Sequence, residues 1–164
     1  MKTSKLSLMI IVMIISIQLQ AQSTVRDRQK EDKIETQLRA IDSTMVQTFK
    51  NATIAMDEQK NELADSLYTI VYEKAPNFDP LLRRLGGLKA MLGETTKGLA
   101  MCEKSVEINR SAYNLSALAN AYLMQNDSAN LIKAQQLLKE AINLPEGDEI
   151  DILANFAQVS FQLN

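Results

Sequence analysis

The stretch "LRRLGGLKAMLGETTKGLAMCEKSVEINR", residues 82 to 110, decides the fold of this chain. Its apolar and small residues recur three and four positions apart, the spacing that lays one stripe along an α-helix. Gly93 interrupts this pattern, and glycine is favoured where a helix ends in a turn. The stretch therefore predicts two helices joined by a short turn at Gly93.

The same two-helix pattern occurs three times along the chain. Each second helix has a small residue followed four positions later by a packing residue: Ala64 and Tyr68, Gly98 and Cys102, Ala134 and Leu138. These pairs are offset by 34 and 36 residues. The first helices carry Leu85-Gly86 and Leu118-Ala119, offset by 33, with an echo at Leu153-Ala154. Two patterns with nearly one period indicate a repeat protein, whose units bury their apolar faces against neighbours. The alternative is an irregular helical bundle with accidental spacing.

This pattern resembles the tetratricopeptide repeat (TPR), a helix-turn-helix unit of about 34 residues. Leu85-Gly86 matches the Leu-Gly pair of that repeat, where a small residue lets two helices approach closely. The resemblance covers about residues 45 to 163 and implies an all-α fold: a TPR-like solenoid of about three repeats with N- and C-terminal capping helices. The chain departs from the pattern at Asn51-Ala52, where Leu-Gly is expected, and at Arg110, where the unit usually ends in proline.

Upstream of the repeats, one apolar stripe runs through Ile34, Leu38, Ile41, Met45, Thr48, Ala52 and Ala55. Asp42 and Ser43 are able to cap a new helix inside this run, so one long helix and two shorter ones both remain open. A coiled-coil dimer through the stripe is a further alternative, although the heptad pattern is short. The sequence thus divides into a signal peptide (1–21), an N-terminal helical segment or cap (22–44), TPR-like repeats (45–147) and a C-terminal capping helix (148–164).

The first residues have the layout of a secretory signal peptide. Lys2 and Lys5 precede the uncharged run Leu6 to Ile17, which is shorter than the roughly 20 residues of a spanning helix. The layout resembles signal peptides of Gram-negative bacteria, and it predicts cleavage after Ala21 and a periplasmic or secreted protein. An uncleaved N-terminal anchor is the alternative. Loss of the two lysines leaves 16 basic and 20 acidic residues, a net charge of −4. We therefore expect no nucleic-acid partner and no stable membrane insertion after signal removal.

The inventory of reactive residues argues against an enzyme. The chain has no histidine, which excludes Ser-His and Cys-His nucleophile pairs and metal sites that need imidazole. Cys102 is the only cysteine, and a lone thiol forms neither an internal disulfide nor a four-thiolate metal site. "GETTKG" at 93 to 98 lacks the Gly-Lys-Ser/Thr order of a phosphate loop. We therefore expect no catalytic residues, no metal and no cofactor.

Cys102 itself is expected in the core of a second helix. The inward stripe of that helix is predicted to contain Leu99, Cys102, Ser105, Val106 and Ile108. Burial among apolar neighbours raises the pKa of a thiol and makes it inert. An enzyme with unusual chemistry around Cys102 remains an alternative, and fast labelling of the thiol at neutral pH would support it.

The TPR resemblance implies that the first helix of each unit lines a concave groove for a peptide or partner helix. The repeat register carries this role to Phe49, Thr53, Arg83, Met91, Tyr113, Ser116, Asn120 and Met124, with Met56, Gly87, Ala90 and Leu123 beside them. Any one of these can instead belong to an ordinary solvated helix face. The expected function is a non-catalytic extracytoplasmic adaptor for a protein or peptide. The alternative is a small-molecule or glycan-binding repeat protein that uses Phe49 and Tyr113 as aromatic platforms.

One mode of TPR binding clamps the C-terminal carboxylate of a partner with two asparagines and several lysines or arginines. The corresponding places here hold Gly87, Ser116, Ala117 and Asp148. The clamp is therefore missing, and we expect no binding of acidic C-terminal tails.

Overall fold

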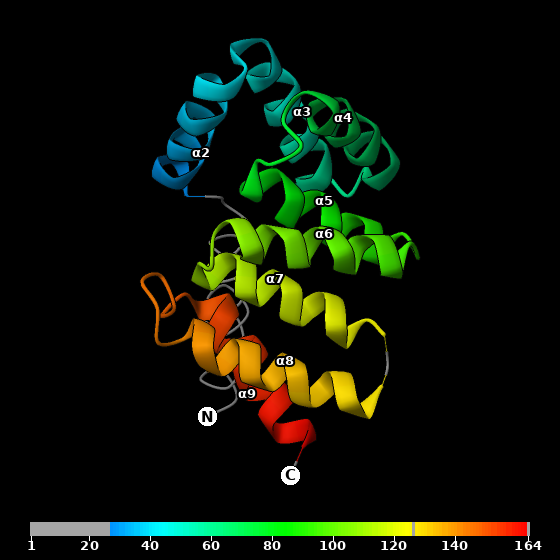
Figure 1. Cartoon of the computed structure of the whole chain (residues 1–164), viewed down its shortest axis with the longest axis vertical. Helices are drawn as coiled ribbons and strands as arrows, with labels where there is room; N and C mark the ends of the chain where they lie inside the picture. The colour runs from blue at the N-terminus through cyan, green and yellow to red at the C-terminus, as the bar shows by residue number, and fades with distance from the viewer. Residues whose placement is uncertain (1–26, 126, 164) are drawn as a thin grey trace, which may run out of the picture. The chain divides into compact units, whose positions relative to one another are not determined.

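The computed structural model describes residues 27–125 and 127–163, which leaves the expected signal peptide outside the described residues. The chain divides into two units, Met1–Gln37 and Leu38–Asn164. Every regular element in the described ranges is a helix, as the sequence predicts (Figure 1). The elements are α2 (Arg28–Ile41), η1 (Ser43–Met45), α3 (Val46–Asp57), α4 (Asn61–Lys74), α5 (Asp79–Met91), α6 (Thr95–Ile108), α7 (Ala112–Leu123), α8 (Ser128–Ala141) and α9 (Ile150–Gln162).

The long apolar run upstream of the repeats forms two helices. α2 ends at Ile41, and Asp42 then adopts an extended backbone with φ of −152°. The carboxylate of Asp42 accepts hydrogen bonds from the backbone N–H of Thr44 at 2.9 Å and from its hydroxyl at 2.6 Å. This is the geometry of an N-cap, and it starts the short η1 that leads into α3. The predicted capping role of Asp42 is therefore confirmed.

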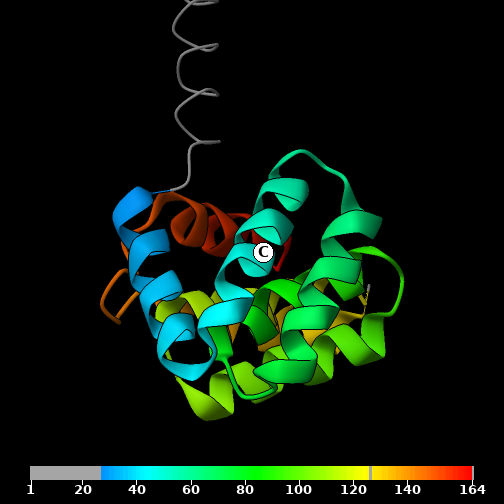
Figure 2. The same cartoon turned by 90° about the horizontal axis from the view of Figure 1, so that it is seen from above.

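Helices pair in chain order within the second unit. α3 packs with α4, α5 with α6, and α7 with α8, while α9 packs against α8 and α7 (Figures 1 and 2). First helices also contact one another directly, α5 with α7 and α7 with α9. This arrangement is consistent with a helical solenoid in which α5 and α7 are neighbouring first helices.

The first two turns between paired helices have the same construction, 34 residues apart. Gln59 and Gly93 adopt left-handed backbones with φ of 59° and 89°. The next N–H groups, those of Lys60 and Glu94, reach back to the carbonyls of Ala55 and Lys89 at 2.8 and 2.9 Å. This hydrogen bond closes the helix end in the Schellman manner, which favours glycine at the left-handed position. The turn predicted at Gly93 is confirmed.

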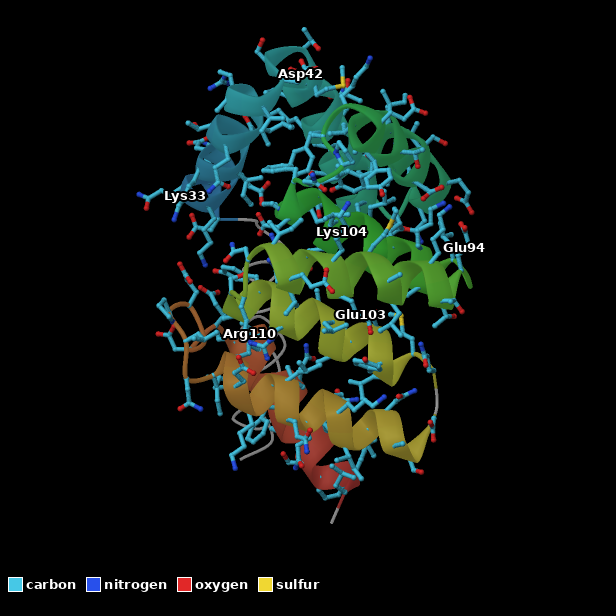
Figure 3. All side chains as sticks on the ribbon, viewed as in Figure 1. Lys33, Asp42, Glu94, Glu103, Lys104 and Arg110 are labelled. Atoms are coloured by element: carbon cyan, nitrogen blue, oxygen red, sulfur yellow. The ribbon has the colours of Figure 1, made fainter. Side chains whose placement is uncertain are left out.

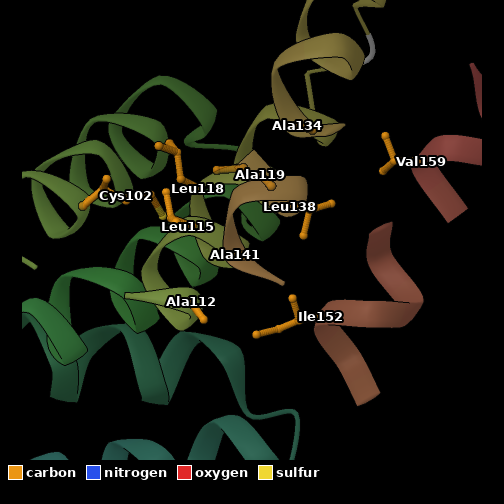
Figure 4. Close-up of a cluster of buried hydrophobic side chains, with 12 residues drawn as sticks. Cys102, Ala112, Leu115, Leu118, Ala119, Ala134, Leu138, Ala141, Ile152 and Val159 are labelled. Atoms are coloured by element: carbon orange, nitrogen blue, oxygen red, sulfur yellow. The ribbon is translucent and has the colours of Figure 1, made fainter. Parts of the chain in front are cut away.

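The repeat positions of the second helices form the core. Tyr68, Cys102 and Leu138 are all completely buried, and so are Ala64 and Ala134. Figure 4 shows the C-terminal part of this core, in which Cys102, Leu115, Leu118 and Leu138 lie together with Ile152 and Val159 of α9. The predicted inward position is wrong for Ile108, which is 44% exposed. Ile108 follows the buried Cys102 by six residues, which turns its side chain about 120° away from the buried side of α6.

Candidate functional site

The predicted contact residues of α5 and α7 occupy equivalent repeat positions on two neighbouring first helices, and we call this set the first-helix face: Arg83, Gly87, Met91, Ser116, Asn120 and Met124. Met91 and Met124 are 60% and 45% exposed. Arg83, Gly87 and Asn120 are half-buried, and Ser116 is nearly covered. Each row advances by four residues, so its members follow one another along one side of a helix. α5 contacts α7, so the two rows belong to neighbouring helices.

Gly87 makes a gap in the first-helix face. A Cβ atom added at Gly87 would have no heavy atom within 4 Å, although Arg83 and Met91 lie one turn to either side. An added Cβ at the adjacent Gly86 would instead lie 2.8 Å from both the Sγ of Cys102 and the carbonyl oxygen of Gly98. Gly86 therefore serves the packing of α5 on α6, as the Leu-Gly pattern predicts, whereas Gly87 leaves backbone open to an approaching chain.

The two rows combine three kinds of contact chemistry. The guanidinium of Arg83 is a cationic donor, and the Asn120 amide has both a donor and an acceptor, the pair that a peptide backbone needs. Met91 and Met124 add flexible, polarisable apolar surface, which suits contacts of irregular shape. The face can therefore hold a peptide by backbone hydrogen bonds and apolar contact.

Tyr113 stands at the edge of this face in a polar cluster with Arg83. The Cζ of Arg83 lies 5.2 Å from the centroid of the Tyr113 ring, within the range of a cation–π contact. The Tyr113 hydroxyl donates to Oε1 of Glu149 at 3.3 Å. These contacts link α5, α7 and the residue before α9. The Arg83 guanidinium also occupies one face of the Tyr113 ring, which makes this ring less suitable for stacking on a sugar.

Phe49 and Thr53 lie in the core rather than on the face, with exposed fractions of 1% and 6%. The Phe49 ring meets Tyr68 and Phe78 edge-on, at centroid distances of 5.5 and 5.8 Å. Thr53 donates to the carbonyl of Phe49 at 3.0 Å, and its Oγ1 lies 2.9 Å from the hydroxyl of Tyr68. Their burial is incompatible with direct partner contact by these side chains, and it removes Phe49 as a glycan platform.

Two buried polar residues that the sequence did not single out connect α5 and α7 to neighbouring helices. Arg84 is 7% exposed; its Nη1 donates to Oγ1 of Thr53 at 2.9 Å, and its Cζ lies 5.0 Å from the centroid of Phe49. Asn114 is 1% exposed. Its Nδ2 lies 2.8 Å from Oδ2 of Asp79, 3.2 Å from the carbonyl of Ser105 and 2.8 Å from that of Asn109. Asn114 thus joins α5, α6 and α7.

Cys102 has the environment of a packing residue. It is completely buried, and burial raises the pKa of its thiol to about 12. A thiol with so high a pKa stays protonated at neutral pH and is a poor nucleophile. The alternative of thiol chemistry at this position therefore has no support in the geometry.

Among residues 27–125 and 127–163, no three side chains of the metal-binding types gather into a potential ion site. In the same part of the chain, the helices fall short of the length and apolarity that crossing a membrane requires.

Comparison with known proteins shows which fold this chain has. No family model matches the chain. It is 29% identical over 143 residues to "Proton pump-interactor 1" of Arabidopsis thaliana, an alignment that spans 77% of the chain but only 22% of that relative.

Two solved structures resemble it at TM-scores of 0.62 and 0.65. The first is the first TPR of Spaghetti (RPAP3) bound to the HSP90 peptide SRMEEVD, with 17% identity over 73% of this chain and 92% of that one. The second is the Sgt2 TPR domain from Aspergillus fumigatus, with 16% identity over 73% and 79%. The chain therefore has the TPR fold.

Proposed function

We propose that this chain is a non-catalytic, extracytoplasmic adaptor that binds a protein or peptide on its first-helix face. The observation that carries the proposal is the open row of Arg83, Gly87 and Met91 on α5 beside Ser116, Asn120 and Met124 on α7. The TPR of RPAP3, which shares the fold, holds a peptide in its structure. The extracytoplasmic part of the proposal depends on the signal-like layout of residues 1–21.

The arrangement favours an extended peptide over a bulky folded surface at Gly87. A missing side chain lets a second backbone approach α5 closely, at a place flanked by Arg83 and Met91. Asn120 on the neighbouring helix can then pair with an amide of that backbone through both its donor and its acceptor. The methionines adapt to the shape of the partner's apolar side chains.

Site-specific photo-crosslinking tests where a partner binds. A photoreactive amino acid replaces Gly87, where an added Cβ meets no heavy atom within 4 Å, and Ala100 on the exposed side of α6 serves as the control position. In cells that express the full chain, we expect one discrete crosslinked protein or peptide from position 87 and none from position 100. Equal crosslinking from both positions would contradict binding on the first-helix face.

The crosslinked partner then allows quantitative binding. Arg83→Glu and Asn120→Ala should each weaken affinity by about tenfold or more, as expected of contacts central to an interface. Lys139→Glu and Gln136→Ala make the same chemical changes at exposed places on α8 and should leave affinity unchanged. Affinity that is indifferent to both face variants would refute the proposal.

The location has its own test. Cell fractionation followed by intact-mass measurement should find the chain outside the cytoplasm and shortened to begin at Gln22. An unshortened chain in the cytoplasmic fraction would overturn the extracytoplasmic part and leave the binding face to be judged by the crosslinking result.

A further inference from the structure

Helix α9 is apolar on two opposite sides. Ile152 and Val159 are buried at 3% and 1% exposure on the side that faces the rest of the solenoid. The other side carries an exposed apolar stripe, which consists of Ile150, Leu153, Ala154, Ala157 and Phe161. Ile150 and Phe161 are 82% and 85% exposed. A helix with apolar residues on both sides is typical of one that packs against structure on both sides.

The repeat register shows what kind of structure covers this side in the other units. Leu82 and Gly86, the fourth and eighth residues of α5, are buried, and so are Leu115 and Ala119 at the same places in α7. Each of these helices packs with its second helix, α5 with α6 and α7 with α8. The fourth and eighth residues of α9 are Leu153 and Ala157, yet Leu153 is 44% exposed and Ala157 is also exposed. The exposed stripe therefore occupies the side of a first helix on which a second helix normally packs.

The lack of charge along α9 indicates what kind of helix can pack on its exposed stripe. After Asp151 the helix has no charged residue as far as Leu163, and its polar residues there are amides and one hydroxyl: Asn155, Gln158, Ser160 and Gln162. A strongly charged partner helix would find no opposite charge along this surface. Another α9 would match it, because two uncharged helices meet without repulsion.

The order of large and small side chains along the exposed stripe is compatible with two copies of α9 related by a two-fold axis. When two copies of α9 lie antiparallel about the midpoint of residues 155 and 156, Ile150 of one copy faces Phe161 of the other, and Ala154 faces Ala157. The large side chains then meet at the two ends, and the alanines at the centre let the helix axes come close. The same patch serves both copies, as an isologous interface requires.

We propose that the exposed stripe of α9 binds the α9 of a second copy in antiparallel orientation and so forms a two-fold symmetric dimer. This interface is separate from the first-helix face of α5 and α7. The dimer would carry two such faces and could hold two partners or a bivalent one.

Sedimentation equilibrium of the full chain over a wide concentration range tests the proposal. We expect a reversible monomer–dimer equilibrium, which Ile150→Lys and Phe161→Glu each shift to monomer. Both sites are more than four-fifths exposed, so the fold should survive, as far-ultraviolet circular dichroism can check. Ile70→Glu on α4 and Ile132→Lys on α8, at 46% and 49% exposure, are matched controls that should leave the dimer intact.

Mixing the two α9 variants tests the orientation. In the antiparallel pair, the introduced lysine of one chain faces the introduced glutamate of the other, while the remaining Ile150 and Phe161 meet as in the wild type. Equimolar mixing should therefore restore a dimer of one chain of each variant. Three outcomes would each overturn the proposal. The first is a wild-type chain that stays monomeric, the second is a dimer that persists in both single variants, and the third is a mixture of the variants that fails to associate. Association driven by the apolar run at Leu6 to Ile17 would appear as the second of these outcomes.

Discussion

Gly86 and Gly98 pack backbone against backbone where α5 crosses α6. A methyl group on Gly86 would lie 2.8 Å from the carbonyl oxygen of Gly98, and one on Gly98 would lie 2.5 Å from the carbonyl oxygen of Gly86. No side chain fits between these two turns. The helix pair therefore depends on both glycines, although glycine weakens a helix interior.

Neighbouring glycines of α5 should respond oppositely to alanine. Gly86→Ala forces α5 away from α6 and should lower the free energy of unfolding by about 1–3 kcal/mol. Gly87→Ala meets nothing within 4 Å and should raise it by about 0.5–1 kcal/mol, because alanine loses less backbone entropy in a helix. Urea unfolding followed by circular dichroism measures both. A change of the same sign in both variants would contradict the packing described for α5.

Asn114 should matter for stability more than its size suggests. Asn114→Ala removes the donor shared by Asp79 and the carbonyls of Ser105 and Asn109, and it leaves buried acceptors without that partner. We expect a loss of about 1–3 kcal/mol. Asn109→Ala is the control, since Asn109 also donates to Asp79 but is exposed. Equal losses for the two variants would show that the buried hydrogen bonds add nothing.

The ion pair of Arg110 and Glu140 should make stability depend on acid pH (Figure 3 labels Arg110). Nε and Nη2 of Arg110 donate to the two carboxylate oxygens of Glu140 at 2.6 and 2.7 Å. This contact holds the pKa of Glu140 below its ordinary value of 4.5. The unfolded chain thus binds the proton more readily, so the stabilisation is complete above pH 4.5 and disappears as pH falls through the lowered pKa.

Glu140→Gln isolates this effect. Because the pair is partly exposed, the variant should lose only roughly 0.2–1 kcal/mol at neutral pH. At a pH where Glu140 is protonated in both states, the variant and the wild type should be equally stable. Thermal unfolding across the acid range measures the difference, and a gap that persists at low pH would mean that the side chain acts through packing instead.

Cys102 should behave as an inert core residue. Its complete burial and a pKa of about 12 predict that the folded protein reacts with a thiol reagent only as fast as it unfolds. Cys102→Ala should keep partner binding and lower stability by about 1 kcal/mol. Denatured protein, which should label at once, is the control. Rapid labelling of the folded chain at neutral pH would reopen the question of a catalytic thiol.

Acidic C-terminal tails should not bind. The peptide SRMEEVD, which the RPAP3 TPR holds in its structure, is a direct probe. The places that would have to clamp its terminal carboxylate hold Gly87, Ser116, Ala117 and Asp148, none of them a cation. Isothermal titration calorimetry should detect no heat of binding. Tight binding that is lost when the terminal carboxylate is amidated would show that the chain has a clamp elsewhere.

The sequence predicted the fold because the repeat is carried by short-range spacing. Helix periodicity, the Asp42 cap and the turn at Gly93 each depend on residues a few positions apart. The period of 33 to 36 residues then indicates which positions pack together, and Tyr68, Cys102 and Leu138 are indeed buried.

The candidate face was predictable only in part, because exposure depends on tertiary neighbours. Phe49 and Thr53 have the correct register for a contact surface but are enclosed by Tyr68, Phe78 and Arg84. The two side chains that hydrogen-bond to the Thr53 hydroxyl, those of Tyr68 and Arg84, are 15 and 31 residues away in the chain. No local sequence pattern reveals contacts at such separations.

Lys89 is a second residue whose burial depends on distant neighbours and could not be predicted from the sequence pattern. It occupies the repeat position of Tyr122, yet its side chain is only 8% exposed between Asp65 at 2.9 Å and Glu94 at 2.7 Å. Hydrogen bonds to these two carboxylates raise its pKa above the ordinary value of 10.5, so the lysine stays charged inside the molecule. A sequence pattern that treats lysine as a surface residue cannot anticipate this pairing.

The contrast between Gly86 and Gly87 has a consequence for how this protein can change. Packing fixes the residue at Gly86, whereas a Cβ atom at the position beside it meets no heavy atom within 4 Å. Under the proposed function, mutation at Gly87 would therefore alter ligand preference without first needing a compensating change in the scaffold. Selection for a new partner, in nature or in the laboratory, has a natural starting point at this residue.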